Sequence, residues 1–157
     1  MSRGHQAAPR KSEKYTNPAM AWIECLPHQP PMRLLEDVVD VKHGESATGR
    51  RLTRPDDFYF QGHFPGHPVV PAIILVELLA QTGGIAAAAR PPGDPPSMLQ
   101  LRVAAIGPFK FPAAAGPGMT LEARARVAGR IGSLFKIEGT VTADGVLVAT
   151  GSLTLAG

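Results

Sequence analysis

Residues Gly62 to Gln81 read GHFPGHPVVPAIILVELLAQ, a proline- and glycine-rich loop that runs directly into an apolar segment. Pro71 suits the first position of a helix, because the N–H that proline lacks is not needed there. From Ala72 to Ala89 the chain consists mostly of strong helix formers. Since these residues are apolar on nearly every side, we expect a helix enclosed by the rest of the chain.

The remaining pattern predicts an antiparallel sheet. Residues 119–127 and 135–142 alternate between apolar and polar side chains with a period of two, which is typical of strands with one packed and one wet face. Further elements are expected as a helix at Pro18–Leu26, strands at Leu34–Val41, Ser46–Leu52, Met98–Ile106 and Val146–Leu155, an ordered loop at Thr53–Val70, and a helix stop at Pro91–Pro96. One long helix among antiparallel strands gives an α+β arrangement, with a curved sheet wrapped around the helix.

Composition limits the possible classes of protein. The 157 residues are 44% hydrophobic and 18% charged, which fits one globular domain over 18–157 behind a flexible tail over 1–17. The sequence contains no run of eighteen apolar residues, so we expect no membrane span. The net charge of +3 permits an acidic partner, while basic residues do not interleave with aromatic ones as on a nucleic-acid surface. A single cysteine, Cys25, and the lack of an apolar leader in the first residues predict the cytoplasm.

The loop and the helix together carry residues suited to acid–base chemistry. His63 lies in a Pro/Gly-rich loop, and imidazole can accept a proton near neutral pH. The first backbone N–H groups of the helix after Pro71 have no partners within the helix and can bind a carbonyl oxygen that gains negative charge. Glu77 follows within the apolar helix, where a carboxyl group tends to stay protonated and can act as a general acid. Such a set suits removal of a proton beside a carbonyl group and protonation of a departing hydroxyl.

This stretch resembles the signature of the 3-hydroxyacyl-[acyl-carrier-protein] dehydratases, the FabZ-like and FabA-like enzymes of the hotdog fold. LPHQPPMRLLEDVVD (Leu26–Asp40) is similar to the Leu-Pro-His-Arg-x-Pro motif that precedes the family's first strand, and VELLAQ (Val76–Gln81) is similar to its Glu-x-x-Ala-Gln motif. FKFPAAAGPGM (Phe109–Met119) loosely matches a later segment that ends in Pro-Gly-Asp. In all, Leu26 to Leu155 can be laid along the family.

The resemblance implies that His63 and Glu77, fourteen positions apart, are the catalytic histidine and glutamate. It implies a homodimer in which each active site takes the histidine from one subunit and the glutamate from the other, with a hexamer built as a trimer of dimers as a further option. The substrate would be a (3R)-hydroxyacyl chain on the phosphopantetheine of acyl carrier protein, the product a trans-2-enoyl thioester, and no metal or other cofactor is implied. The residues expected to contact the substrate are Phe64, Gly66, Ala72 and Gln81.

The chain departs from the family pattern at several positions. Ala72 replaces the usual glycine after the helix-opening proline, Gln29 replaces an arginine, and Met119 replaces the aspartate of Pro-Gly-Asp. These departures favour a specialised acyl or polyketide-like pathway at least as much as housekeeping fatty-acid synthesis. They also leave open a non-catalytic hotdog protein that binds acyl thioesters, and a hotdog thioesterase is the other alternative.

Some residues also have other interpretations. His63 and His67 have the spacing of a metal-binding pair, but Pro65 makes that spacing non-helical and no third ligand lies near in sequence, so we expect no metal. His28 is expected to order a turn, Phe60 and Phe64 to line a tunnel or the core, and Gln81 either to hydrogen-bond within the site or to serve packing alone.

Overall fold

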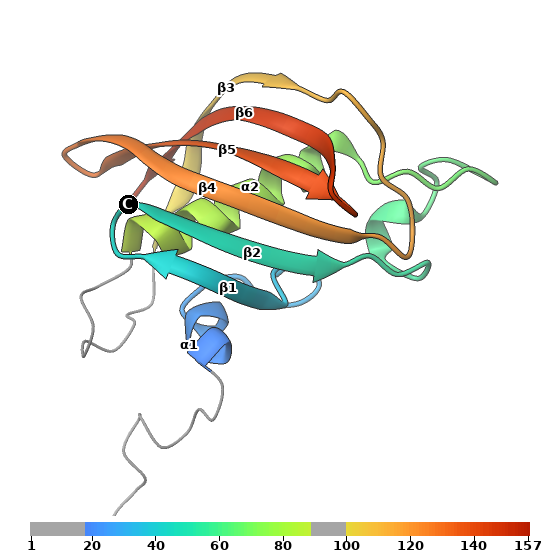
Figure 1. Ribbon diagram of the computed structural model, residues 1–157, viewed down its shortest axis with the longest axis horizontal. Helices are drawn as coiled ribbons and strands as arrows, with labels where there is room; N and C mark the ends of the chain where they lie inside the picture. Colours follow the sequence, from blue (N-terminus) through green and yellow to red (C-terminus); the bar gives the residue numbers. More distant parts are fainter. Residues whose placement is uncertain (1–17, 89–99) are drawn as a thin grey trace, which may run out of the picture.

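A computed structural model describes residues 18–88 and 100–157. Its centre is an antiparallel sheet of six strands in the order β1-β2-β4-β5-β6-β3, which arches over the helix α2 (Figure 1). The strands are β1 (Asp37–Lys42), β2 (Ser46–Leu52), β3 (Arg102–Lys110), β4 (Thr120–Ile131), β5 (Leu134–Ala143) and β6 (Val146–Ala156), and the helical elements are α1 (Pro18–Glu24), η2 (Phe58–Phe60) and α2 (Ala72–Ala88). This is the expected α+β hotdog arrangement.

The sheet closes over α2 because the inner side of each central strand is apolar and small. On β4, Leu121, Ala123 and Ala125 are buried while the intervening residues are partly or fully exposed. The α2 helix packs against β4 more extensively than against any other strand, and the alanines there let the two backbones approach. Gly139 on β5 permits an equally close approach, since a Cβ atom at this position would overlap the backbone of β4 and lie 2.7 Å from Leu79 of α2.

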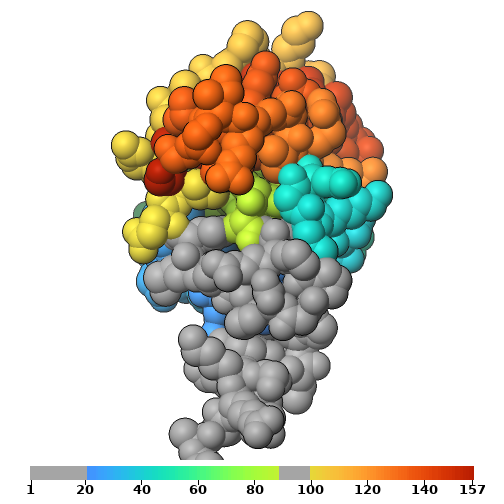
Figure 2. Space-filling view, turned by 90° about the vertical axis from the view of Figure 1, so that its left-hand side faces the viewer, coloured from blue at the N-terminus to red at the C-terminus, as the bar shows by residue number. Residues whose placement is uncertain are grey.

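The expected burial of α2 holds for most of the helix but is wrong for its first two residues. Residues 78–86 are all buried, as are Ile74 and Leu75, whereas Ala72 is exposed and Ile73 is 75% exposed. One side of the first turn is therefore uncovered within this single chain. The far end of α2 is visible in Figure 2 between the cyan residues of the β1–β2 hairpin and the yellow residues near β3.

Several boundaries differ from those expected. β1 begins at Asp37 and not at Leu34, because the N–H groups of Leu34 and Leu35 donate to a side chain of α2 instead of joining the sheet. β3 extends to Lys110, four residues beyond the expected strand end. The expected tail over 1–17 and the proline run over 91–96 lie outside the described residues.

β3 forms one edge of the sheet and pairs only with β6. Its register with β6 is interrupted twice, between Val103 and Ala105 and between Ile106 and Phe109. The strand is largely exposed, and the side chain of Ile106 is 63% exposed. An edge strand with free backbone groups and exposed apolar side chains is suited to pairing with another strand. Within 18–88 and 100–157, no helix has the length and apolar character needed to span a membrane.

Candidate active site

The loop that carries His63 is fixed by its own backbone. The N–H of Val69 donates to the carbonyl of His63 at 2.8 Å, and Val70 donates to the carbonyl of Ala115 at 2.8 Å. Gly62 and Gly66 lie in the left-handed region, with φ of 76° and 72°, where glycine is favoured. The expected ordered loop is therefore present, and it presents a half-buried His63.

The hydrogen bond of the His63 ring assigns its tautomer. Nδ1 lies 2.8 Å from the carbonyl oxygen of Val69. Because a carbonyl oxygen can only accept, the neutral ring carries its hydrogen on Nδ1 and keeps a free lone pair on Nε2. Phe64 stacks on the ring, with centroids 4.1 Å apart. The ring is thus oriented, and Nε2 is the atom able to take a proton.

A second contact fixes the loop after β3 to the end of β2. The buried hydroxyl of Thr53 donates to the carbonyl of Gly116 at 2.8 Å and accepts from the N–H of Met119 at 3.0 Å. The backbone of Thr53 also accepts from Gly118 and donates to Met119, both at 2.9 Å. The segment that binds Val70 through Ala115 is thereby anchored to the sheet.

Glu77 lies on the exposed side of α2, in a small polar cluster. Its Oε1 accepts from Nε2 of Gln81 at 3.0 Å and lies 3.1 Å from Nε2 of His28. The Glu77 side chain is 24% exposed, so the complete burial expected from its apolar neighbours is wrong for the single chain. A pocket of about 220 Å³ opens beside the carboxyl group, and it is lined by Leu26, Pro27, His28, Glu77, Ala80, Gln81, Gly84, Leu101, Arg102, Val103 and Leu155.

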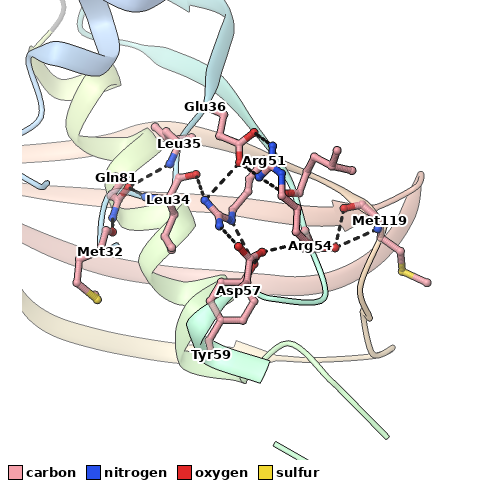
Figure 3. A network of polar contacts seen from close by, with 12 residues as sticks. Met32, Leu34, Leu35, Glu36, Arg51, Arg54, Asp57, Tyr59, Gln81 and Met119 are labelled. Carbon is pink, nitrogen blue, oxygen red and sulfur yellow. Dashed lines mark hydrogen bonds and ion pairs between the residues drawn. The ribbon is translucent and has the colours of Figure 1, made fainter. Parts of the chain in front are cut away.

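Gln81 joins this cluster to the backbone before β1 (Figure 3). Its side-chain oxygen accepts from the N–H of Leu34 at 2.9 Å, and its nitrogen donates to the carbonyl of Met32 at 2.8 Å as well as to Glu77. The residue is 1% exposed. Gln81 therefore hydrogen-bonds both to Glu77 and to the main chain before β1, and its contact with a substrate stays a prediction.

A partly buried ion pair holds the same backbone from its other side, as Figure 3 shows. Arg51 of β2 donates to the carbonyl of Leu34 at 3.1 Å and to Asp57 at 2.6 Å. The Tyr59 hydroxyl donates to Asp57 at 2.7 Å, and burial together with this bond raises the pKa of Tyr59 to about 12. Burial alone would raise the pKa of Asp57, but the hydrogen bonds it accepts and the Arg51 charge hold that pKa below its ordinary value. The sequence pattern gave no sign of this network.

The other expected site residues divide into two groups. Ala72 opens α2 with an exposed methyl group, Phe64 is 54% exposed, and a Cβ at Gly66 would meet no atom within 4 Å, so all three face open space. Phe60, by contrast, is a core residue at 5% exposure. His67 is exposed, and within the described ranges no cluster of three or more histidine, cysteine or acidic side chains is placed to hold a metal ion.

His63 and Glu77 do not meet within one chain. No ion pair or hydrogen bond joins the two described side chains, and the pocket beside Glu77 does not include His63. The structure instead brings His28 to Glu77, a contact that the sequence pattern did not predict.

Comparison with known proteins identifies the family to which the chain belongs. The model of the FabA-like domain matches residues 26–152. The chain belongs to this dehydratase family. Its relatives include the 3-hydroxyacyl-[acyl-carrier-protein] dehydratases FabZ of Roseiflexus castenholzii, 34% identical over 85% of this chain and 92% of the relative, and of Lactococcus lactis subsp. cremoris, 33% identical over 85% and 90%.

Solved structures agree with the hotdog fold of the FabA-like family. The dehydratase heterocomplex ApeI:P from Xenorhabdus doucetiae aligns with a TM-score of 0.68 at 20% identity, over 85% of this chain and 89% of that one. The PaaI protein of the E. coli phenylacetic acid degradation operon aligns with a TM-score of 0.57 at 15% identity, over 77% and 82%. At such identities the likeness concerns the fold alone.

Proposed function

We propose that this protein dehydrates (3R)-hydroxyacyl chains carried on acyl carrier protein to trans-2-enoyl thioesters, in the cytoplasm, with His63 and Glu77 as the acid–base pair. The observation that carries the assignment of roles is the 2.8 Å bond from Nδ1 of His63 to the Val69 carbonyl. It leaves Nε2 as the free base on an oriented ring. Membership of the FabA-like family supports the same reaction.

The reaction balances without a further reactant. Nε2 of His63 takes a proton from the carbon beside the thioester carbonyl, and the electrons of that C–H bond form the new C=C bond. The C–O bond to the 3-hydroxyl breaks, and Glu77 gives its proton to the departing oxygen, which leaves as water. In the proposal, the Ala72 N–H in the first turn of α2 binds the thioester oxygen as charge develops there. The proposed step therefore calls for no metal or redox cofactor.

The proposal includes a homodimer that shares its active sites. No hydrogen bond or ion pair joins His63 to Glu77 among the described residues of one chain, which supports a site that takes one of them from a second copy. The open edge of β3 and the exposed Ile106 offer a surface for strand pairing between copies, and the exposed first turn of α2 at Ile73 would be covered by the same partner. A trimer of such dimers is the next larger assembly that we propose to look for, and light scattering of the purified protein measures it directly.

The test is hydration, the reverse reaction, of trans-2-enoyl thioesters on acyl carrier protein and on coenzyme A. Loss of enoyl absorbance reports activity. A His63→Ala variant should lower kcat/KM by about 10²- to 10⁴-fold, because general base catalysis is lost. His67→Ala is the matched control, since His67 is exposed and lies in the same loop. Persistent activity in His63→Ala contradicts the mechanism, and hydrolysis of the thioester in place of hydration would identify a thioesterase.

A further inference from the structure

The cluster around Glu77 contains a histidine that the reaction above does not use. His28 lies between α1 and β1, and its Nε2 is 3.1 Å from Oε1 of Glu77. Its side chain is 27% exposed, so the contact is partly shielded from water. Both residues line the same pocket, where Arg102 of β3 is the other residue that can carry charge.

The two ring nitrogens of His28 differ in their surroundings. Nδ1 is buried and has no hydrogen-bond partner among the described residues. A hydrogen on Nδ1 would therefore be a buried donor without an acceptor, which is costly. A hydrogen on Nε2 instead has Oε1 of Glu77 as an acceptor 3.1 Å away, and Oε1 can accept whether or not the carboxyl group is protonated on Oε2. The geometry favours the tautomer with its hydrogen on Nε2.

The chain that follows His28 is bonded to α2 and to β2. Gln81 bonds the Met32 carbonyl and the Leu34 N–H, and Arg51 bonds the Leu34 carbonyl. The nitrogen of Gln81 that donates to Met32 also donates to Oε1 of Glu77. Oε1 therefore has two neighbours, Gln81 and His28, whose backbones are fixed to each other. Oε2 has no bond within the described residues, which leaves it as the oxygen available to a substrate.

We propose that His28 is a positioning residue for Glu77, which donates from Nε2 to Oε1 and directs Oε2 to the substrate hydroxyl. When Glu77 has given the proton on Oε2 to the departing oxygen, the remaining carboxylate receives hydrogen bonds from both His28 and Gln81 on Oε1. Such bonds are stronger to the charged form than to the neutral acid. His28 therefore assists the step in which Glu77 becomes negatively charged. This inference rests on the proposed dehydration.

The kinetic test compares His28→Ala with His28→Gln. Loss of a hydrogen bond to a charged group should lower kcat about 10- to 100-fold in His28→Ala, with KM changed less than about threefold, because the inference has His28 act only through Glu77. His28→Gln should recover most of the loss, since its amide can donate from a similar position. His43→Gln is the matched control, because His43 is an exposed histidine at the β1–β2 turn. A wild-type kcat in His28→Ala, or equal losses in the alanine and glutamine variants, would overturn the inference.

A second measurement does not depend on activity. Long-range ¹H–¹⁵N spectra of the labelled protein report which ring nitrogen of each histidine carries hydrogen. The His28 signals should show the Nε2–H tautomer, and Glu77→Gln should shift them while leaving the His43 signals in place. An Nδ1–H tautomer, or His28 signals insensitive to Glu77→Gln, refutes the inference. If the wild-type protein hydrates no enoyl thioester, the proposed function fails, and the spectra alone decide whether His28 positions Glu77.

Discussion

A test of the shared active site combines two different chains in one dimer, each with a substitution in one of the two proposed catalytic residues. In a heterodimer of His63→Ala with Glu77→Gln, one site contains both substitutions and the other contains neither. The purified heterodimer should therefore have about half the wild-type activity per dimer, although each parent homodimer is nearly inactive. An unpurified mixture formed from equal amounts, in which about half of the dimers are mixed, should have about a quarter.

The reciprocal heterodimer is the control. Here one chain carries both substitutions and its partner is wild type, so a shared arrangement places one defect in each site and abolishes activity. If instead each chain supplied its own His63 and Glu77, the wild-type chain would retain a complete site and about half the activity. The two arrangements thus predict opposite results for the same four residues.

The assay is hydration of an enoyl thioester by heterodimers purified through two different affinity tags. Native mass spectrometry before and after the assay shows whether the mixed species has exchanged subunits, because the two tags give the chains different masses. Activity in the double-substituted heterodimer, together with none in the first, would refute the shared site. It would also mean that the side chains of His63 and Glu77 act together within one chain, although no hydrogen bond or ion pair joins them among the described residues.

Other predictions concern stability and reactivity. Gly139→Ala should lower the free energy of unfolding by about 1 to 3 kcal/mol in urea titrations, because its Cβ would overlap the adjoining strand. Gly129→Ala is the control and should change this free energy little, because a Cβ there meets no atom within 4 Å. Burial raises the pKa of Cys25 to about 11, so only about one thiol in a thousand is ionised at pH 8, and alkylation of the folded protein by iodoacetamide should be far slower than that of the unfolded chain. The lowered pKa of Asp57 means that it contributes stability above the unfolded-state pKa of about 3.9 and loses that contribution as the pH falls through the folded-state value. Asp57→Asn should therefore lower stability at pH 7 and flatten its decline below about pH 5, and an unchanged slope in urea titrations across this range would contradict the role given to the Arg51 ion pair.

The fold followed from local patterns that a sequence displays directly. The alternation along residues 119–127 and 135–142 marks two central strands, observed at 120–131 and 134–143, and Pro71 marks the start of α2 within one residue. The predicted ends of strands were less accurate where a side chain binds backbone N–H groups that would otherwise join the sheet. Gln81 takes the N–H groups before β1, and no local pattern can show this, because the partners are 46 and 47 positions apart.

The site was only partly accessible from the sequence for the same reason. Motif and spacing selected His63, Glu77 and Gln81, and their catalytic and binding roles stay predictions. The contact of His28 with Glu77 joins two motifs that are far apart in the chain, so each motif could be quoted without revealing the pair. The exposure of Ile73 and Ile106 likewise depends on where the sheet ends, which hydrophobicity along the chain does not reveal.

Met119 ends the segment Pro117-Gly118-Met119, and its contacts with Thr53 all pass through its main chain. The side chain of Met119 can therefore be replaced without loss of the main-chain bonds between this residue and Thr53. The same feature sets a rule for engineering. Substitutions within residues 115–119 leave Val70 its acceptor, because that acceptor is the main-chain carbonyl of Ala115, whereas an insertion or deletion there would displace it.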